Sequence, residues 1–377
     1  MKKKICLFCE TWESGGIESF LTNVLSHMDL SRFEVDLVAE KIKDSVFTPK
    51  LEKLNINFHE LSGHQHSLVN ERRFRSILLA RRYDVLHLNL FHAVALRYAF
   101  IAKNAGVPRR IAHSHNTNLR RSVTKELKLV AHTISKNYYS EFVTDFWACS
   151  SKAAKFLFSE SSLQKKPFRF IPNGIDTERF RFSEGIREKV RKEMGLSDAF
   201  IIGNVGRLCY QKNQIFLVKL LPEILKQYPN AVLMLIGEGP DKDRLLAEAQ
   251  KNGVERNILL LGTTSMPEKY YCAMDVFMFP SHFEGLGIAA VEAQCAGLPV
   301  LCAEGVPPEV QCSQNIKFLP INGGYKPWLT GLKVKTSLER RRGIESVRAK
   351  GFDIHNVSFA FEEAWEARNR KLKQGLL

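Results

Sequence analysis

The stretch DVFMFPSHFEGLGIAAVEA, residues 275–293, contains a strand, a glycine turn and the start of a helix. Residues 275–279 predict a buried strand, Pro280 opens the turn, and the run from Ile288 to about Ala296 predicts a helix. The first N–H groups of a helix lack partners within it, and the helix dipole favours negative charge there. This order of elements therefore predicts an anion site at the carboxyl end of a strand.

Two acids stand in the same stretch, Glu284 in the turn and Glu292 in the helix. A carboxylate beside a phosphate site is better suited to accept hydrogen bonds from hydroxyl groups than to hold the phosphate. Together they favour a phosphorylated, hydroxyl-rich ligand such as a nucleotide-activated sugar. The alternative is an ordinary loop acid and a solvated or capping helix acid.

Short apolar runs recur along the chain in two sets, with helix-length segments between several of them. The runs are 5–9, 35–39, 85–90, 111–115, 146–149 and 168–171, then 200–205, 232–236, 258–261, 276–279, 299–302 and 316–319. Strands this apolar are usually buried on both faces, which predicts parallel sheets covered by helices. The two sets predict two doubly wound, Rossmann-like α/β domains facing across a cleft, with the ligand at strand carboxyl ends.

The length of 377 residues also favours more than one domain. The boundary is expected near PNGID, residues 172–176, which gives domains 1–175 and 176–360. The charged segment from Ser337 to the end predicts solvated helices, with a last helix over 361–377 that packs back on the first domain.

Charge is uneven between the halves: residues 1–170 hold 27 Lys and Arg against 16 Asp and Glu, and residues 171–377 hold 28 against 24. Nucleic acid and anionic membranes both bind such an excess through summed, salt-sensitive attraction. The eight cysteines show neither a disulfide rhythm nor zinc spacing, which predicts buried free thiols and a cytoplasmic location. The sequence has no run of about 18 apolar residues, so no membrane-spanning helix is expected.

An apolar stripe with three- and four-residue spacing runs through the basic part of the first half. Its members are Leu119, Val123, Leu127, Val130, Ile134 and Tyr138. Two interpretations stay open: a helix packed on the core through this stripe, or one lying on an anionic membrane. Nucleic acid is not expected, because neither aromatic platforms nor a known nucleic-acid fold accompany the basic residues.

A second loop with ligand chemistry is GNVGRLCYQKN, residues 203–213, between a predicted strand and a helix. Arg207 and Lys212 in this loop can flank a diphosphate, Arg through its planar fork and Lys as a point charge. The alternative is a pair of surface cations.

The first domain has a glycine pair after its first predicted strand, Gly15 and Gly16. They would let the backbone approach a phosphate or sugar, although a tight turn explains them equally well. The third glycine of the dinucleotide fingerprint is missing, which argues against a nicotinamide enzyme.

His115 ends another predicted strand and could hydrogen-bond a sugar hydroxyl or offset charge developed during bond cleavage; a structural histidine is the alternative. A metal held by His113 and His115 is not expected, because no third ligand accompanies them.

In this order, these motifs resemble glycosyltransferase family 4 of the GT-B fold over nearly the whole chain. The resemblance rests on Gly15-Gly16, Pro172-Asn-Gly-Ile-Asp176, Gly206-Arg-Leu with Lys212, Gly237-Glu-Gly-Pro240, and Glu284-Gly-Leu-Gly with Glu292-Ala. Lys212-Asn213, where many members have Lys-Gly, resembles the branch that builds bacterial exopolysaccharides and capsules. Asn89 stands where relatives often place a second histidine.

The resemblance implies a retaining, metal-independent glycosyltransferase, which agrees with the absence of an Asp-x-Asp motif. It would move a sugar from a nucleotide-sugar donor, UDP-sugar favoured, to a lipid-linked or oligosaccharide acceptor in surface polysaccharide synthesis. The first domain would serve the acceptor, and its basic surface would allow peripheral association with an anionic membrane. The alternatives are a nucleotide-sugar epimerase of the same fold and a non-enzymatic nucleic-acid-binding protein.

Residue by residue, the resemblance implies a donor site of Gly15, Gly16, Arg207, Lys212, Glu284, Gly285, Leu286, Gly287 and Glu292. Arg207 and Lys212 would hold the diphosphate, with Gly16 on the phosphate from the first domain. Glu292 would bind the ribose hydroxyls and Glu284 the sugar hydroxyls. The residues expected to act in catalysis are His115, Glu284, Arg207 and Lys212.

Overall fold

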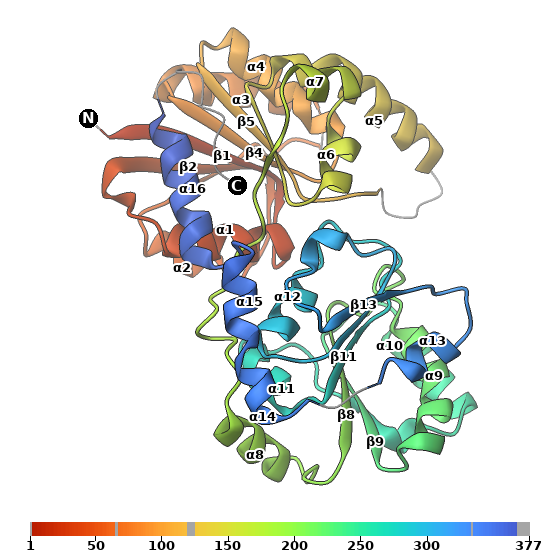
Figure 1. Cartoon of the computed structure of the whole chain (residues 1–377). Helices are drawn as coiled ribbons and strands as arrows, with labels where there is room; N and C mark the ends of the chain where they lie inside the picture. The colour runs from red at the N-terminus through yellow and green to blue at the C-terminus, as the bar shows by residue number, and fades with distance from the viewer. Residues whose placement is uncertain (1, 65–66, 119–124, 333–334, 368–377) are drawn as a thin grey trace. The chain divides into compact units, whose positions relative to one another are not determined.

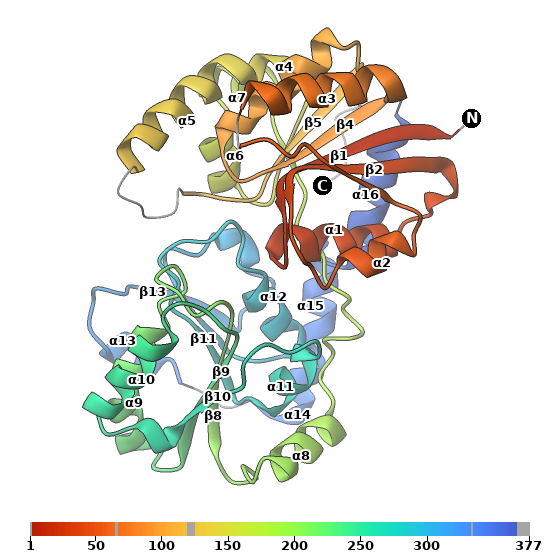
Figure 2. The same ribbon diagram turned by 180° about the vertical axis from the view of Figure 1, so that it is seen from behind.

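The computed structural model describes residues 2–64, 67–118, 125–332 and 335–367. The chain forms two compact units, Met1–Gly174 with Ile354–Leu377, and Ile175–Asp353. Each unit has one parallel sheet with helices packed against it, as Figures 1 and 2 show. The predicted class of two doubly wound α/β domains is thereby confirmed. Among the described helices, none has the length and apolar character needed to cross a membrane.

The first domain is built on a seven-stranded sheet of order β3-β2-β1-β4-β5-β6-β7, parallel throughout. Its strands are β1 (Lys3–Trp12), β2 (Phe33–Ile42), β3 (Asn57–Glu60), β4 (Val85–Leu90), β5 (Arg109–Ser114), β6 (Asp145–Ala148) and β7 (Arg169–Phe170). All but β3 overlap a predicted apolar run. β3 lies at the sheet edge and its sequence NFHE is mostly polar, so it contains no apolar run from which it could be predicted.

Helices cover both faces of this sheet. They are α1 (Gly16–Ser26), α2 (Thr48–Glu52), α3 (Leu68–Arg81), α4 (Arg97–Asn104), α5 (Lys125–Tyr139), α6 (Ser151–Leu157), α7 (Glu160–Lys165) and α16 (Ile354–Glu366). Neighbouring residues of a strand point to opposite faces. Leu7 joins the core cluster that includes residues of α1 and α16, whereas the Phe8 ring lies 5.6 Å from that of Phe74 on α3 and 4.4 Å from that of Tyr98 on α4.

The second domain has a six-stranded sheet of order β10-β9-β8-β11-β12-β13, again parallel. Its strands are β8 (Phe200–Val205), β9 (Ala231–Ile236), β10 (Ile258–Leu260), β11 (Val276–Phe279), β12 (Val300–Ala303) and β13 (Ile316–Leu319). Its helices are α8 (Glu184–Glu193), α9 (Gln214–Gln227), α10 (Lys242–Lys251), α11 (Pro267–Ala273), α12 (Ile288–Cys295), α13 (Lys326–Thr330), α14 (Ser337–Arg341) and α15 (Gly343–Ala349). Every strand overlaps a predicted run.

The C-terminal helix α16 belongs to the first domain and lies alongside α1 in both views. Phe361 and Trp365 are fully buried in the first domain's core, and Ser358 Oγ donates a 3.0 Å hydrogen bond to the carbonyl of Val24. The sequence-based expectation of solvated helices is wrong here, because apolar residues at helical spacing outweigh the charged composition. The return to the first domain begins at Ile354, before the boundary expected at residue 360.

In both sheets the strand order reverses beside the first strand, between β1 and β4 and between β8 and β11. Loops at the carboxyl ends of such strands lead away in opposite directions and leave room for a ligand. The loops after β1, β8 and β11 are those that carry the predicted glycines, cations and Glu284.

Candidate functional site

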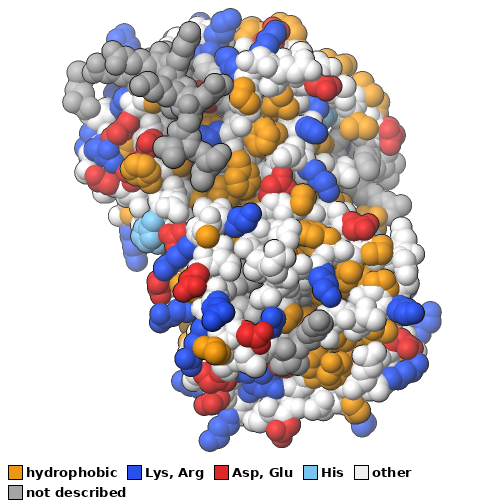
Figure 3. Space-filling model, viewed as in Figure 1, with side chains coloured by type: hydrophobic (Ala, Val, Ile, Leu, Met, Phe, Trp, Pro, Cys, Tyr) orange, Lys and Arg blue, Asp and Glu red, His pale blue; other side chains and the backbone are white. Residues whose placement is uncertain are grey.

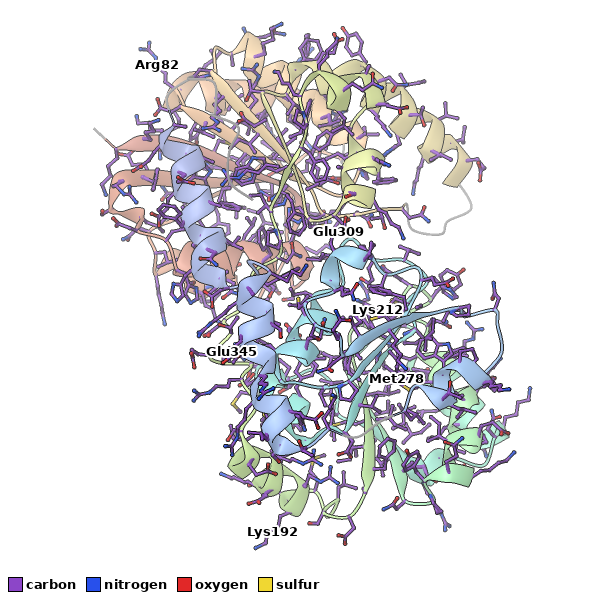
Figure 4. The ribbon with its side chains drawn as sticks, in the orientation of Figure 1. Arg82, Lys192, Lys212, Met278, Glu309 and Glu345 are labelled. Carbon is purple, nitrogen blue, oxygen red and sulfur yellow. The ribbon has the colours of Figure 1, made fainter. Side chains whose placement is uncertain are left out.

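In the second domain the loops after β8 and β11 are joined by an ion pair. Lys212 Nζ lies 2.8 Å from Glu284 Oε1, and both side chains are largely buried. The ammonium also lies 4.8 Å from the centre of the Phe279 ring, at the end of β11. Figure 4 labels Lys212 at the strand-end side of this domain. Two predicted residues that are far apart in sequence therefore form one charged centre.

Three further hydrogen bonds hold these loops together. The His282 N–H donates to the Gln211 carbonyl at 2.8 Å, Gln211 Nε2 to the Phe283 carbonyl at 3.1 Å, and Asn213 Nδ2 to the Pro280 carbonyl at 3.1 Å. Asn213 has a φ of 54°, a left-handed conformation that Asn and Gly adopt most readily. This explains the Lys-Asn variant of a motif that often reads Lys-Gly.

The Gly237-Glu-Gly239 motif serves close packing of backbone. A Cβ on Gly237 would lie 2.2 Å from the Gly206 carbonyl oxygen, and one on Gly239 equally close to that of Leu208. The Leu208 N–H donates to the Glu238 carbonyl at 3.0 Å. The loop after β9 therefore supports the loop that carries Arg207, whose side chain is exposed.

Helix α12 begins within the predicted anion motif. Gly287 is its N-cap with a φ of 100°, and a Cβ there would lie 3.0 Å from the Phe279 ring. Leu286 is buried and Gly285 is partly exposed. The fold thus brings the N–H groups of this turn to the same strand end as the Lys212 ion pair.

Glu292 lies on α12 and accepts a 2.7 Å hydrogen bond from the hydroxyl of Tyr271 on α11. Burial raises the pKa of the Glu292 carboxyl, whereas the bond from Tyr271 lowers it. Tyr271 is itself fully buried. Sequence reasoning missed this partner, because nothing in the α11 sequence indicates which residue its hydroxyl reaches.

In the first domain, Gly15 is the N-cap of α1 and Gly16 its first residue. A Cβ on Gly15 would lie 2.6 Å from Glu18 Oε2, whereas one on Gly16 would meet nothing within 4 Å. Phe20 of α1 reaches the His115 ring, with 5.3 Å between ring centres. Helix α1 therefore links the glycine turn to the predicted histidine.

His115 follows β5, and its Nε2 lies 3.1 Å from Oδ1 of Asn89 at the end of β4. The His113 ring lies beside it with centres 4.0 Å apart, and His113 is also 5.9 Å from His87. Burial lowers the pKa of His87 and His113 well below the usual value, and that of His115 to about 3. All three imidazoles are therefore neutral near pH 7.

This histidine cluster predicts a loss of stability in acid. Below pH 6.5 these histidines become protonated in the unfolded chain but stay neutral in the folded chain. The free energy of unfolding therefore decreases as the pH decreases. The slope is expected to be up to about 1.4 kcal/mol per pH unit for each histidine. Urea unfolding at several pH values between 7.5 and 5 measures it. A His113→Leu variant should show a shallower slope, and an unchanged slope would contradict this explanation.

Within each domain the structure groups the predicted residues: Lys212, Glu284, Gly285, Leu286, Gly287 and Glu292 in the second, and Gly15, Gly16 and His115 in the first. Arg207 begins the loop that ends at Lys212, without joining the ion pair. Among the described residues, no group of three or more His, Cys, Asp or Glu is arranged to hold a metal ion. All eight cysteines are free thiols, and all but Cys209 are buried.

Two family models match the chain. The model for Glycosyltransferase Family 4 matches residues 14–179, and the model for Glycosyl transferases group 1 matches residues 186–319. Together they cover most of both domains.

Similar proteins match over comparable lengths. EpsF of Bacillus subtilis (strain 168), named as a glycosyltransferase, is 26% identical over 84% of this chain and 83% of its own. The capsular polysaccharide biosynthesis glycosyltransferase CapH of Staphylococcus aureus is 24% identical over 89% of this chain and 91% of its own. A Campylobacter jejuni N-acetylgalactosaminyltransferase, whose name includes a diphospho-undecaprenol-linked sugar, is 27% identical over 80% and 81%.

Solved structures share the fold. HepE of Anabaena, crystallised with UDP-glucose, superposes with a TM-score of 0.73 and 18% identity over 96% of this chain and 98% of its own. WaaG, a glycosyltransferase involved in lipopolysaccharide biosynthesis, superposes with a TM-score of 0.68 and 16% identity over 97% of this chain and 100% of its own.

Proposed function

The chain belongs to glycosyltransferase family 4 with the GT-B fold, and from this premise we propose that it transfers a sugar from a UDP-sugar to a lipid-linked glycan. We further propose that transfer retains the anomeric configuration and needs no divalent metal. The observation that carries the proposal is the Lys212–Glu284 pair beside the N-terminus of α12. A cation, a carboxylate and the N–H groups of a helix N-terminus at one strand end suit a ligand with both phosphate and hydroxyl groups.

Without donor, Lys212 balances the charge of Glu284. A bound diphosphate would supply a second anion to Lys212, and Glu284 would accept hydrogen bonds from sugar hydroxyls. Arg207, already exposed, would close on the diphosphate through its planar fork. Glu292 would bind the ribose hydroxyls, held in place by Tyr271. Gly16 would leave room for phosphate at the start of α1.

The chemical step follows from this arrangement. The bond between the anomeric carbon and the diphosphate breaks, and negative charge develops on the leaving group. Lys212, Arg207 and the α12 N-terminus stabilise that charge, while the acceptor hydroxyl attacks the oxocarbenium-like carbon from the same face. The hydroxyl oxygen forms the new glycosidic bond, and its proton passes to the leaving diphosphate oxygen. His115, neutral because of its low pKa, would offer a hydrogen bond rather than a positive charge. Charge stabilisation of the leaving group is the main catalytic contribution.

The acceptor and location are proposed from the relatives and the first domain. The names of CapH and of the Campylobacter enzyme refer to capsular polysaccharide and to a diphospho-undecaprenol-linked sugar. We place this protein in surface polysaccharide synthesis in the cytoplasm, peripheral to the membrane that holds such an acceptor. These matches support neither an epimerase nor a nucleic-acid-binding protein. On the face in Figure 3, basic side chains are interspersed with acidic ones and form no continuous band.

Thermal unfolding with UDP, GDP, ADP or NAD, each with and without EDTA, tests the donor class. UDP at about one hundred times its Kd is expected to stabilise the fold by about 2.7 kcal/mol, equally in EDTA. Glu292→Gln should lower the UDP response, whereas Glu345→Gln, at an exposed position of α15, should keep it. Stabilisation that disappears in EDTA would contradict metal independence, and no response to any nucleoside diphosphate would contradict the donor site.

A further inference from the structure

Helix α5 exposes apolar side chains and buries polar ones. Its buried residues are the polar His132 and Ser135. Its large apolar residues on one face are exposed: Leu127 by 74%, Val130 by 58%, Ile134 by 64% and Tyr138 by 58%. These four residues, called the α5 stripe below, lie at three- and four-residue spacing and so share a face. The core-packing interpretation of the stripe is wrong for these four; Leu119 and Val123 lie outside the described residues.

Polar contacts and aromatic rings near its C-terminal end anchor α5, with the Tyr139 ring 6.2 Å from that of Phe100 on α4. His132 Nδ1 accepts a 3.1 Å hydrogen bond from the Ala93 N–H, and its Nε2 donates to the Phe156 carbonyl at 2.9 Å. Lys136 Nζ also donates to the Lys155 carbonyl. The helix is thus held on the first domain with its stripe facing outward. An apolar helix face exposed to water is unfavourable unless a partner covers it.

We propose that the α5 stripe docks the protein on an anionic phospholipid bilayer by inserting among the headgroups. Charge decides between this partner and an apolar protein surface. The sequence of helix α5 contains Lys125, Lys128 and Lys136 against Glu126 alone. Lys128, and Lys155 of the adjoining α6, are exposed, and Lys136 is half-buried. An amphipathic helix with basic residues and exposed leucine, isoleucine and tyrosine is the type that lies in the interface of a charged membrane.

The position of α5 in the chain connects docking to the reaction. It is the helix that follows β5 and His115, so the surface that meets the lipid belongs to the same domain as the proposed active-site histidine. This inference rests on the proposed lipid-linked acceptor. It differs from attraction by a basic domain alone, because insertion leaves a part of the binding that salt does not remove.

Co-sedimentation with vesicles tests the proposal. Wild type is expected to sediment with vesicles of phosphatidylglycerol and phosphatidylcholine, less with phosphatidylcholine alone, and to stay partly bound in high salt. The triple variant Leu127→Gln, Val130→Gln, Ile134→Gln is expected to lose about tenfold or more of its partition coefficient. The matched control is Leu68→Gln, Leu79→Gln, which removes two exposed leucines of α3 and should bind like wild type.

Four readings would overturn the proposal: no sedimentation of wild type with either vesicle, undiminished binding of the triple variant, binding fully abolished by salt, or equal loss in the α3 control. Sedimentation velocity tests whether a second copy of the chain covers the stripe instead. If wild type is a dimer and the triple variant is a monomer, the stripe is an interface between copies. UDP stabilisation is measured on the same variants. If UDP stabilises wild type and every variant while none of them binds vesicles, the membrane proposal is wrong and the donor site stands. If wild type binds vesicles but no nucleotide stabilises it, the proposed function is contradicted instead.

Discussion

Replacing Lys212 by alanine is expected to lower turnover by about two to three orders of magnitude. Removing one contact that stabilises developing charge typically costs about 3 to 4 kcal/mol of transition-state energy. Lys212 is the cation that the structure fixes at the strand end, 2.8 Å from Glu284 and over the Phe279 ring. The measurement is release of nucleoside diphosphate with a cognate donor and acceptor under saturating conditions.

Lys212→Ala also leaves the buried Glu284 carboxylate without its counter-ion, which by itself destabilises the domain. In the double variant Lys212→Ala, Glu284→Gln this carboxylate charge is absent, so stability should recover. Glu284 is itself proposed to bind the donor, so the stability of this variant, and not its turnover, measures the charge effect. Lys219→Ala is the matched control, because Lys219 is a half-exposed cation on α9 of the same domain. Turnover of Lys212→Ala close to that of wild type would remove Lys212 from the mechanism.

Replacing Arg340 by methionine is expected to cost about 3 to 5 kcal/mol of stability. Arg340 is buried, and its guanidinium donates to four backbone carbonyls: those of Ala296, Cys272, Met274 and Tyr271, at 3.1, 3.1, 3.0 and 2.9 Å. Methionine fills similar space but leaves these acceptors without a donor. Urea unfolding measures the loss.

The expected loss is specific to position 340. Arg341→Met changes the neighbouring, exposed arginine of α14 and should leave stability nearly unchanged. Arg340 also holds the end of α11, which carries Tyr271, so weaker UDP binding should accompany the loss of stability. Equal stability of the two variants would show that the buried bonds contribute little.

Much of the fold follows from apolar runs, because strands buried on both faces need them throughout. β3 escapes prediction because an edge strand such as Asn57–Glu60 keeps polar residues exposed. The stripe of α5 shows a different difficulty. Spacing places Leu127 and Ile134 on one face, but it does not say whether that face meets the core or the outside.

The sequence indicated which residues of the candidate site would gather at the strand ends, but not the contacts that they make there. Strand-end glycines and charges mark Lys212, Glu284 and Glu292, since parallel strands direct such loops to one edge. Their partners Tyr271 and Phe279 depend on how α11 and β11 pack, which no local spacing encodes. Asn89 is hydrogen-bonded to His115. In the sequence it stands out only because relatives often have a histidine at this position.

The return of α16 to the first domain has a consequence for biosynthesis. Phe361 and Trp365 complete the core around β1, and Lys3 Nζ donates to the Trp365 carbonyl at 3.1 Å. The core of the first domain therefore stays incomplete until residues that follow the second domain have been synthesised. During translation both sheets are synthesised before the helix that completes the core of the first domain. A truncated transcript or premature stop after Asp353 would therefore damage the N-terminal domain, although every one of its strands had been synthesised.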